Sequence, residues 1–449
     1  MDILQHQADL LITDCSVLMA DFTIKENQTI AIKDARIIDI NDTAFNEKKY
    51  TAATQLNAKG KLAMPGLVDA HMHTCQQLLR GRITDELPMI WTRIMVPYES
   101  NLTAADVSHS AQLCCLEMIK SGTTTFADAG GIYMDKVAEV VIASGLRGVM
   151  TCSTMDTGHN IPAAMKATKD DLIRANKALY HNFHGSGDGR LHVWFSLRSI
   201  ITCTAELITD VFAAAAEHKT GVHAHMNEYP NEISYCLEHY RKRPLEYLES
   251  LGVLNPNFVS AHSIMLSENE MDILKQYDSK VVHCPASNSG KGIPKTPSLL
   301  QKKITVALGT DGAAHSGLSV FDQMKIFKSL MRASWGVPSS DPVVMPSQTI
   351  VAMATSGGAA ALLQQAETGT LEVGKKADFI LIDTDQPHIQ PTHNLVNTLV
   401  ESVNSKDVTD MIVNGKIIMQ NREVLTLDEA KILHDSKQAL KRMAVRAGI

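Results

Sequence analysis

Two histidines one residue apart, His71 and His73, close an apolar stretch that runs from Met64 to Ala70. Side chains alternate between the two faces of a β-strand, so residues separated by one position point to the same side. If this stretch is a buried strand, both imidazoles lie together near its end. Converging neutral imidazoles are ligands for a transition metal, although an isolated pair of this kind is more often structural. The rest of the chain must therefore supply the missing ligands.

A second strand-like stretch, Thr220 to His225, also ends in histidines. His225 stands at its tip and Glu228 follows three residues later. We therefore expect Glu228 in the loop above His225, where a general acid or base would lie. Alternation turns His223 inward, one layer deeper. Its two interpretations are a hydrogen-bonded core histidine, which we favour, and a further ligand.

Other predicted strands end in the same way. The stretch from Asn257 ends at His262, and the stretch from Thr305 is followed by Asp311. The carboxyl ends of parallel strands meet at one rim of an α/β barrel, where such side chains come together. One or two of these endings could arise by chance, but a series of them predicts a site that handles a metal ion and protons.

The order of strand-like and helix-like segments predicts the fold. Residues 65–364 alternate between the two types, which favours a parallel (β/α)8 TIM barrel with the predicted metal site at its rim. Residues 1–64 and 365–449 contain short strand patterns, including a hairpin turn at Asn414-Gly415, and we expect them to form one small β-sandwich. The pattern Thr426-Leu427-Asp428-Glu429 is typical of a capping box and predicts a terminal helix toward Val445.

Composition excludes several classes of protein. The 449 residues are 45% hydrophobic and 20% charged, with a net charge of −7 and no run of basic residues, so we expect no nucleic-acid partner. No apolar stretch is long enough to cross a bilayer, and we expect a cytoplasmic protein that does not bind membranes. The eight cysteines show no metal or disulfide spacing. Cys75, beside His73, is expected to be a packing residue rather than a nucleophile.

Several motifs together resemble the amidohydrolase superfamily, within the branch of methylthioadenosine/S-adenosylhomocysteine deaminases, guanine deaminases and triazine hydrolases. They cover nearly the whole chain: the Pro-Gly-Leu-Val-Asp-Ala-His-Met-His stretch, Ser-Gly-Thr-Thr-Thr-Phe-Ala-Asp at 121–128, His-Met-Asn-Glu at 225–228, Ala-His at 261–262, Ser-Asn at 287–288 and Leu-Gly-Thr-Asp-Gly-Ala at 308–313. The resemblance implies a hydrolytic deaminase that acts on an amino-substituted nitrogen heterocycle and releases ammonia.

The resemblance also implies a metal site with one divalent ion, held by His71, His73, His225 and Asp311. Zn²⁺ suits three imidazoles and a carboxylate, and Fe²⁺ would also fit. No strand-end lysine stands out as a bridge to a second metal. The catalytic residues implied are Asp311, which accepts a proton from the attacking water, Glu228, which protonates the ring nitrogen, and His262, which hydrogen-bonds the attacking oxygen.

The implied substrate contacts give mixed signals. Trp91 and Glu99 are similar to residues of the adenosine-type deaminases, where the glutamate binds ribose hydroxyls. Gln76 and Arg198 instead match positions at which guanine deaminases read the purine edge, and an ion pair at the barrel mouth is the alternative interpretation of Arg198. The run after Asp311 is closer to the nucleoside deaminases, and there we slightly favour a pocket position for His315 over a loop cap.

Three hypotheses follow for the function. The first is a deaminase of methylthioadenosine or S-adenosylhomocysteine. The second is an aminohydrolase or chlorohydrolase of a free guanine, pterin or triazine. The third is a metal-free binding or scaffold relative, which requires broken ligand sets that this sequence does not have. The partner is thus a small heterocyclic substrate, and a homodimer is expected from the resemblance alone.

Overall fold

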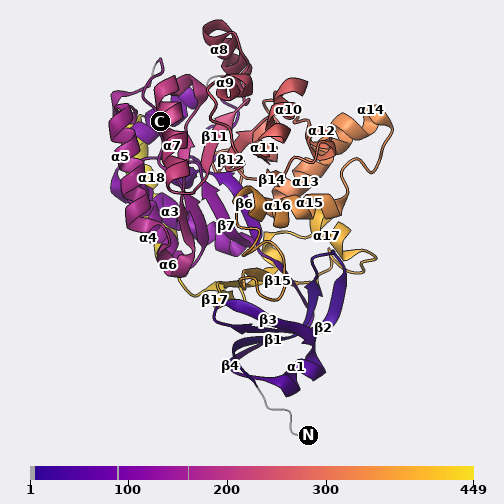
Figure 1. Cartoon of the computed structure of the whole chain (residues 1–449). Coiled ribbons are helices and arrows are strands. Elements are labelled where there is room, and N and C mark those ends of the chain that lie inside the picture. The colour runs from indigo at the N-terminus through magenta and orange to yellow at the C-terminus, as the bar shows by residue number, and fades with distance from the viewer. Residues whose placement is uncertain (1–5, 88–89, 160, 449) are drawn as a thin grey trace.

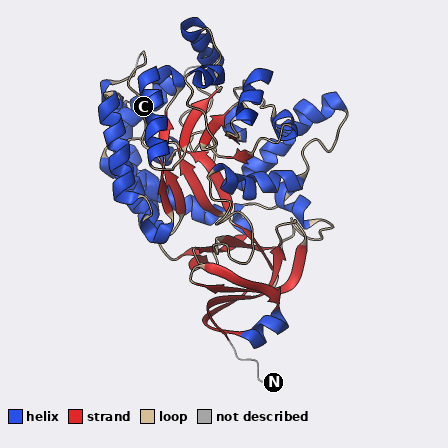
Figure 2. Ribbon diagram, in the orientation of Figure 1, coloured by secondary structure: helices blue, strands red, loops and turns tan. Residues whose placement is uncertain are grey.

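A computed structural model describes residues 6–87, 90–159 and 161–448. Its centre is a set of parallel strands surrounded by helices (Figures 1 and 2). The central strands are β6 (Leu67–Met72), β7 (Thr123–Asp128), β8 (Arg147–Met150), β9 (Leu191–Val193), β10 (Phe195–Leu197), β11 (Val222–Met226), β12 (Phe258–His262), β13 (Lys280–His283) and β14 (Val306–Leu308).

The central strands close into a barrel. They pair in the orders β6-β7-β8-β9 and β10-β11-β12-β13-β14. Only Trp194 separates β9 from β10, and its backbone N–H donates to the Met150 carbonyl at 2.8 Å, so β9 and β10 occupy one strand position. On the other side, the Asp311 N–H donates to the His71 carbonyl at 3.0 Å and joins the end of β14 to β6. The expected eight-position TIM barrel is confirmed.

Helices follow the barrel strands and cover their outer face (Figure 2). They include α3 (Ala104–Ser121), α4 (Met134–Ser144), α5 (Lys169–Phe183), α7 (Ala205–Glu217), α8 (Pro230–Tyr240), α9 (Pro244–Ser250), α10 (Glu268–Gln276), α12 (Thr296–Gln301), α13 (Val320–Met331), α15 (Ser347–Ala354) and α16 (Ser356–Ala361). The Thr103 side chain caps α3, and Gly122 ends it in a left-handed conformation (φ 89°) directly before β7.

The two ends of the chain form one mixed sheet, as expected from their strand patterns. In Figure 1 the late, yellow strands lie beside the indigo ones. The sheet runs β18-β17-β16-β15-β5-β1-β2-β3, and β4 pairs with β1. Its strands are β1 (His6–Leu18), β2 (Ile24–Lys33), β3 (Arg36–Asp42), β4 (Tyr50–Asn57), β5 (Lys61–Pro65), β15 (Phe379–Asp383), β16 (Val408–Val413), β17 (Lys416–Gln420) and β18 (Glu423–Val424).

The mixed sheet is attached firmly to the barrel. β5 continues into β6 through Gly66, so the sheet leads directly to the strand that carries His71. Arg147 on β8 and Asp378 beside β15 form a buried ion pair of 2.7 Å between the two parts. The domain boundaries expected at residues 64/65 and 364/365 remain a prediction.

The C-terminal helix packs on the barrel. The expected helix is α18 (Glu429–Ala447), and its N-cap is Asp428, whose side chain accepts from the Lys431 N–H. Thr426, the residue that the sequence pattern placed at the cap, instead donates its hydroxyl to the Ser144 carbonyl at 2.7 Å. An ion pair of 2.8 Å between Lys120 and Glu429 fixes α18 against α3.

The cysteines are reduced and mostly buried. None of the eight cysteines forms a disulfide, and all are buried except Cys152, which is half-buried. Cys75 is among the buried ones, and burial raises the pKa of its thiol well above the usual value, which agrees with a packing role. Within the described ranges, no helix has the length and apolar character needed to span a membrane.

Candidate active site

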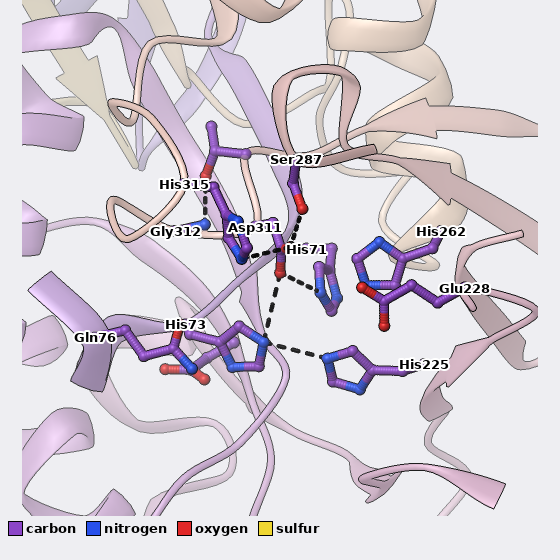
Figure 3. A network of polar contacts seen from close by, with 12 residues as sticks. His71, His73, Gln76, His225, Glu228, His262, Ser287, Asp311, Gly312 and His315 are labelled. Atoms are coloured by element: carbon purple, nitrogen blue, oxygen red, sulfur yellow. Dashed lines mark hydrogen bonds and ion pairs between the residues drawn. The ribbon is translucent and has the colours of Figure 1, made fainter. Parts of the chain in front are cut away.

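Four potential metal ligands meet at the carboxyl-terminal rim of the barrel (Figure 3). His71 lies near the end of β6, His73 directly follows β6, and His225 lies on β11. Asp311 follows β14 by three residues. One ligand atom from each of these four residues lies within 4.8 Å of all the others. The barrel thus brings together the full ligand set expected from the sequence.

Asp311 is the centre of this group. Its Oδ1 lies 3.2 Å from His71 Nε2 and 3.6 Å from His73 Nε2. His73 Nε2 in turn lies 3.2 Å from His225 Nε2. The Nε2 atoms of three imidazoles and one carboxylate oxygen therefore face one small volume between the strands.

The protonation states of the group suit a metal. Burial lowers the pKa of His73 and His225 well below the usual histidine value, and a neutral imidazole is the form that ligates. Burial opposes ionisation of Asp311, but His315, the hydrogen bond with His71 and Lys291 bring its pKa below the usual aspartate value. Three imidazoles and one carboxylate fit a single divalent transition-metal ion.

The backbone is bent at the strand ends to aim these side chains inward. His262 and Asp311 both adopt left-handed conformations, with φ of 67° and 62°. Each such residue costs on the order of 1–3 kcal/mol, so the surrounding structure must hold it in place. Gly309 permits the close approach of β6 to the segment after β14, because a Cβ there would lie 2.7 Å from the His71 carbonyl oxygen.

Glu228 and His262 form a second group beside the first. Glu228 Oε1 lies 3.7 Å from His262 Nε2, and Asp311 also reaches this group. His262 Nδ1 contacts Asn288 Oδ1 at 3.0 Å, and burial lowers the pKa of His262 to about 4, so its ring is neutral. The Glu228 N–H donates to Glu232 at 3.0 Å, which anchors the loop. The expected acid/base residue therefore lies beside the ligand set.

His223 is a core histidine that contacts the ligand set. Its ring lies one layer deeper than His225, is 1% exposed, and is absent from the groups of potential ligands among the described residues. His223 Nε2 lies 2.7 Å from His71 Nδ1. The interpretation that we favoured from the sequence agrees with this geometry, with the addition that its hydrogen-bond partner is a metal-ligand candidate.

A cavity of about 830 Å³ opens above the ligand set. Three of the substrate contacts expected from the sequence line it, namely Trp91, Arg198 and His315. His315 Nε2 also lies 3.2 Å from Asp311 Oδ2. Its apolar lining includes Ile83, Leu87, Ile90, Trp91, Met95 and Ile201. The cavity is large enough for a heterocycle with a substituent.

The other two expected contacts, Gln76 and Glu99, are not among the described residues that line the cavity. They lie behind Arg198 in a buried polar cluster. Glu99 Oε1 accepts hydrogen bonds from Arg198 at 2.9 Å and from Gln76 at 2.7 Å. Glu99 Oε2 has no hydrogen-bond partner although it is buried. Arg198 thus combines both sequence interpretations, since it forms an ion pair and also faces the cavity.

Two residues of the site were not assigned a role from the sequence. Ser287, on the short helix α11 (Pro285–Asn288), lies 2.5 Å from Asp311 Oδ2. Lys291, in the loop after α11, lines the cavity and lies 2.5 Å from Glu228 Oε1. The Ser-Asn motif gave a signal for Ser287. A lone lysine in an aperiodic loop gave none, because its position depends on how the loop folds back.

A parallel barrel with this set of side chains at its rim is the framework of an α/β-barrel hydrolase. The chain belongs to the amidohydrolase family, whose family model matches residues 62–418.

Two relatives extend the match over most of the chain. A 5'-deoxyadenosine deaminase of Methanosarcina acetivorans is 35% identical, covering 98% of this chain and 99% of its own length. A 5-methylthioadenosine/S-adenosylhomocysteine deaminase of Thermoanaerobacter pseudethanolicus is 36% identical over 86% of this chain and 88% of its own. These relatives confirm the expected enzyme class, a hydrolase that acts on carbon–nitrogen bonds.

A solved structure agrees with the fold. An adenosine deaminase from Xanthomonas campestris with bound zinc superposes with a TM-score of 0.92 at 26% identity, covering 98% of this chain and all of that one. The barrel and the mixed sheet are therefore both shared with a known deaminase. The zinc ion is a feature of that structure.

Proposed function

We propose that this protein is a metal-dependent deaminase whose substrates are adenosines modified at the 5' position, such as 5'-deoxyadenosine and methylthioadenosine. The convergence of His71, His73, His225 and Asp311, with Glu228 beside them, is the observation that carries the proposal. The names of relatives about 35% identical to this chain support the substrate class. Zn²⁺ is the proposed ion, because it suits this donor set and is bound in the similar adenosine deaminase.

The reaction replaces the exocyclic amine of the ring by oxygen and releases ammonia. His71, His73, His225 and Asp311 would hold a divalent ion, which when bound would supply a nucleophile at neutral pH by lowering the pKa of a water molecule toward about 7. Asp311 accepts the proton that this water loses. Glu228 protonates the ring nitrogen next to the reacting carbon, which makes that carbon electrophilic.

His262 supports the tetrahedral stage of the reaction. Its Nδ1 faces Asn288 and its Nε2 is a buried atom with no hydrogen-bond partner, directed toward Glu228. Because the Nδ1–H donates to Asn288 Oδ1, Nε2 of the neutral ring is unprotonated and can accept a hydrogen bond from the O–H of the attacking water without reorganisation. The proton taken up by Asp311 finally leaves with the amine as ammonia. The remaining hydroxyl proton passes to Glu228, which replaces the proton that Glu228 gave to the ring nitrogen, and the ring carbon keeps the oxygen as a carbonyl.

A second candidate substrate is an oxo-heterocycle such as guanine or a pterin. One observation favours it: Arg198 faces the cavity, whereas Glu99, the expected ribose contact, lies behind it and already accepts from Arg198. A guanidinium offers only donors, so it suits a carbonyl or ring-nitrogen acceptor on the substrate. A ribose diol could reach Glu99 only if Arg198 moved.

Ammonia release by the zinc-loaded protein tests the proposal. The panel comprises 5'-deoxyadenosine, methylthioadenosine, S-adenosylhomocysteine, adenosine, guanine, a pterin and an aminotriazine, with chloride release from a chlorotriazine measured in parallel. We expect the modified adenosines to give the highest kcat/KM. A preference for guanine or the pterin would support the second candidate, and no turnover of any compound would refute the deaminase proposal.

Two substitutions separate the candidates further. Glu99→Gln should weaken the use of nucleosides much more than the use of free bases, because only nucleosides carry the diol. Arg198→Met should abolish most turnover of an oxo-heterocycle, because it removes the donor that the carbonyl needs. If Glu99→Gln affects both substrate types equally, Glu99 does not bind the ribose. If Arg198→Met keeps full activity, the role of Arg198 is structural only.

We also propose, on family resemblance alone, that the protein is a cytoplasmic homodimer. Its solution mass tests the oligomeric state directly. Light scattering coupled to size exclusion should give twice the chain mass of 49.1 kDa, and a value equal to one chain would refute the dimer.

A further inference from the structure

Lys291 connects the two acidic residues of the site. The loop after α11 turns back at once, since the N–H groups of Lys291 and Gly292 both donate to the Asn288 carbonyl, at 2.7 and 2.9 Å. This turn brings the Lys291 side chain into the rim, where it is only 9% exposed. A lysine is almost never buried to this extent without a partner, so its contacts need an explanation.

The contacts form a continuous chain of hydrogen bonds. Lys291 Nζ lies 2.5 Å from Glu228 Oε1 and 2.7 Å from Ser287 Oγ. Ser287 Oγ in turn donates to Asp311 Oδ2 at 2.5 Å, and one carboxylate oxygen of Asp311 lies within 4.8 Å of one of Glu228. Figure 3 shows Ser287, Asp311 and Glu228 around the same space. One ammonium and one hydroxyl therefore tie the carboxylate of Glu228 to that of Asp311.

The electrostatics agree with an ion pair between Lys291 and Glu228. Burial alone would lower the pKa of Lys291, but Glu228 and Asp311 outweigh it and raise that pKa above the usual lysine value. Lys291 Nζ also lies 5.2 Å from the centre of the Tyr229 ring, which closes the site on the loop side. The charge of Lys291 compensates two carboxylates that would otherwise repel each other across the site.

We propose that Lys291 is a positioning residue of the deamination: it holds the Glu228 carboxylate in the orientation that faces the reacting ring, at a fixed separation from Asp311. This inference rests on the proposed function. A group that exchanges protons with the substrate must lie within hydrogen-bond reach of its target, and a displacement of about 1 Å can cost about 100-fold in rate. Since Lys291 acts through Glu228, its removal should affect the chemical step rather than the binding of metal.

The test compares variants of the full-length, zinc-loaded enzyme with the substrate that the wild type uses best. Lys291→Met should lower kcat about 10- to 100-fold with KM changed less than about threefold. Lys291→Arg, which keeps the charge and the donors, should recover most of kcat. Lys295→Met is the matched control: Lys295 lies on the same loop and forms no ion pair within the described residues, so it should retain wild-type kcat.

A double variant, compared with Glu228→Gln, tests the route of the effect. If Lys291 acts through Glu228, then Glu228→Gln/Lys291→Met should be no slower than Glu228→Gln alone, because the positioned group is already lost. Zinc content and melting temperature are measured for every variant. If Lys291→Met is unfolded at the assay temperature, Lys291→Arg and Ser287→Ala are compared with the wild type in its place. Ser287→Ala breaks the link to Asp311 and should lower kcat by a smaller factor.

Two results would overturn the inference. One is a kcat of Lys291→Met within twofold of the wild type, and the other is a loss of kcat that follows the loss of bound zinc in all variants. The proposed function fails separately, since its failure appears as a wild-type enzyme that releases no ammonia from any compound of the panel.

Discussion

His71 Nδ1 and His223 Nε2 lie 2.7 Å apart in the core of the barrel. For His71 to ligate a metal through Nε2, its Nδ1 must carry the proton, so His223 Nε2 must be the acceptor. His223 therefore sets the tautomer of His71. The Nδ1 of His223 has no hydrogen-bond partner, and burial lowers the pKa of this ring well below the usual value, which keeps the ring neutral.

We expect His223→Phe to weaken zinc binding about 10- to 100-fold, the usual effect of removing a residue that orients a ligand. His223→Gln should bind zinc more tightly than His223→Phe, because its amide oxygen can accept from His71 Nδ1. Competition with a chromophoric chelator measures both affinities. Equal affinities of His223→Phe and the wild type would show that His71 does not depend on this hydrogen bond.

Metal removal should abolish the reaction and lower the stability. Dialysis against a chelator should remove the ammonia release, and Zn²⁺ or Fe²⁺ should restore it. An ion present at 1,000 times its dissociation constant stabilises the folded chain by about 4 kcal/mol, which calorimetry detects as a rise in melting temperature. With Asp311→Asn, added Zn²⁺ should neither restore ammonia release nor raise the melting temperature. If this variant regains activity and melting temperature as the wild type does, Asp311 is not a ligand.

The buried pair of Arg198 and Glu99 makes a prediction about stability. Each side chain is 3% exposed or less, so removing one partner leaves the other charge buried and should cost about 3–5 kcal/mol in the free energy of unfolding. Urea denaturation of Glu99→Gln and Arg198→Met measures these costs. The double variant should lose clearly less than the two single losses combined, and simple additivity would mean that the pair is not coupled.

The pH dependence of stability should contain a contribution from Glu232. Burial raises its pKa from 4.5 to about 8. The folded chain thus binds a proton that the unfolded chain releases between these values, and the stabilisation is lost as the pH rises through about 8. We expect the free energy of unfolding to fall by up to about 1.4 kcal/mol per pH unit in that window.

Glu232→Gln is the matched variant for this prediction. Its amide oxygen can still accept from the Glu228 N–H, but the side chain no longer titrates. Urea denaturation between pH 5 and pH 9 should therefore give a flatter profile for Glu232→Gln than for the wild type. Parallel profiles would assign the pH dependence to other groups.

The sequence by itself determined the elements and the donor types. The strand and helix around Gly122, the hairpin at Asn414-Gly415 and the terminal helix all follow local rules of periodicity, capping and turn formation. The order of His73, His225 and Asp311 at strand ends predicted a metal site because strand direction fixes the rim at which they meet. Among these elements, the terminal helix differs at its N-cap, which is Asp428, because the Thr426 hydroxyl donates to the Ser144 carbonyl instead.

The tertiary structure alone decided the contacts between distant segments. Whether Glu99 faces a ribose or Arg198, whether His223 reaches His71, and whether Lys291 reaches Glu228 depend on distances of a few ångströms between side chains from different strands and loops. Strand and helix periodicity fixes the direction of a side chain but not its partner. Loops have no periodicity at all, so the lysine that links the two carboxylates left no pattern in the sequence.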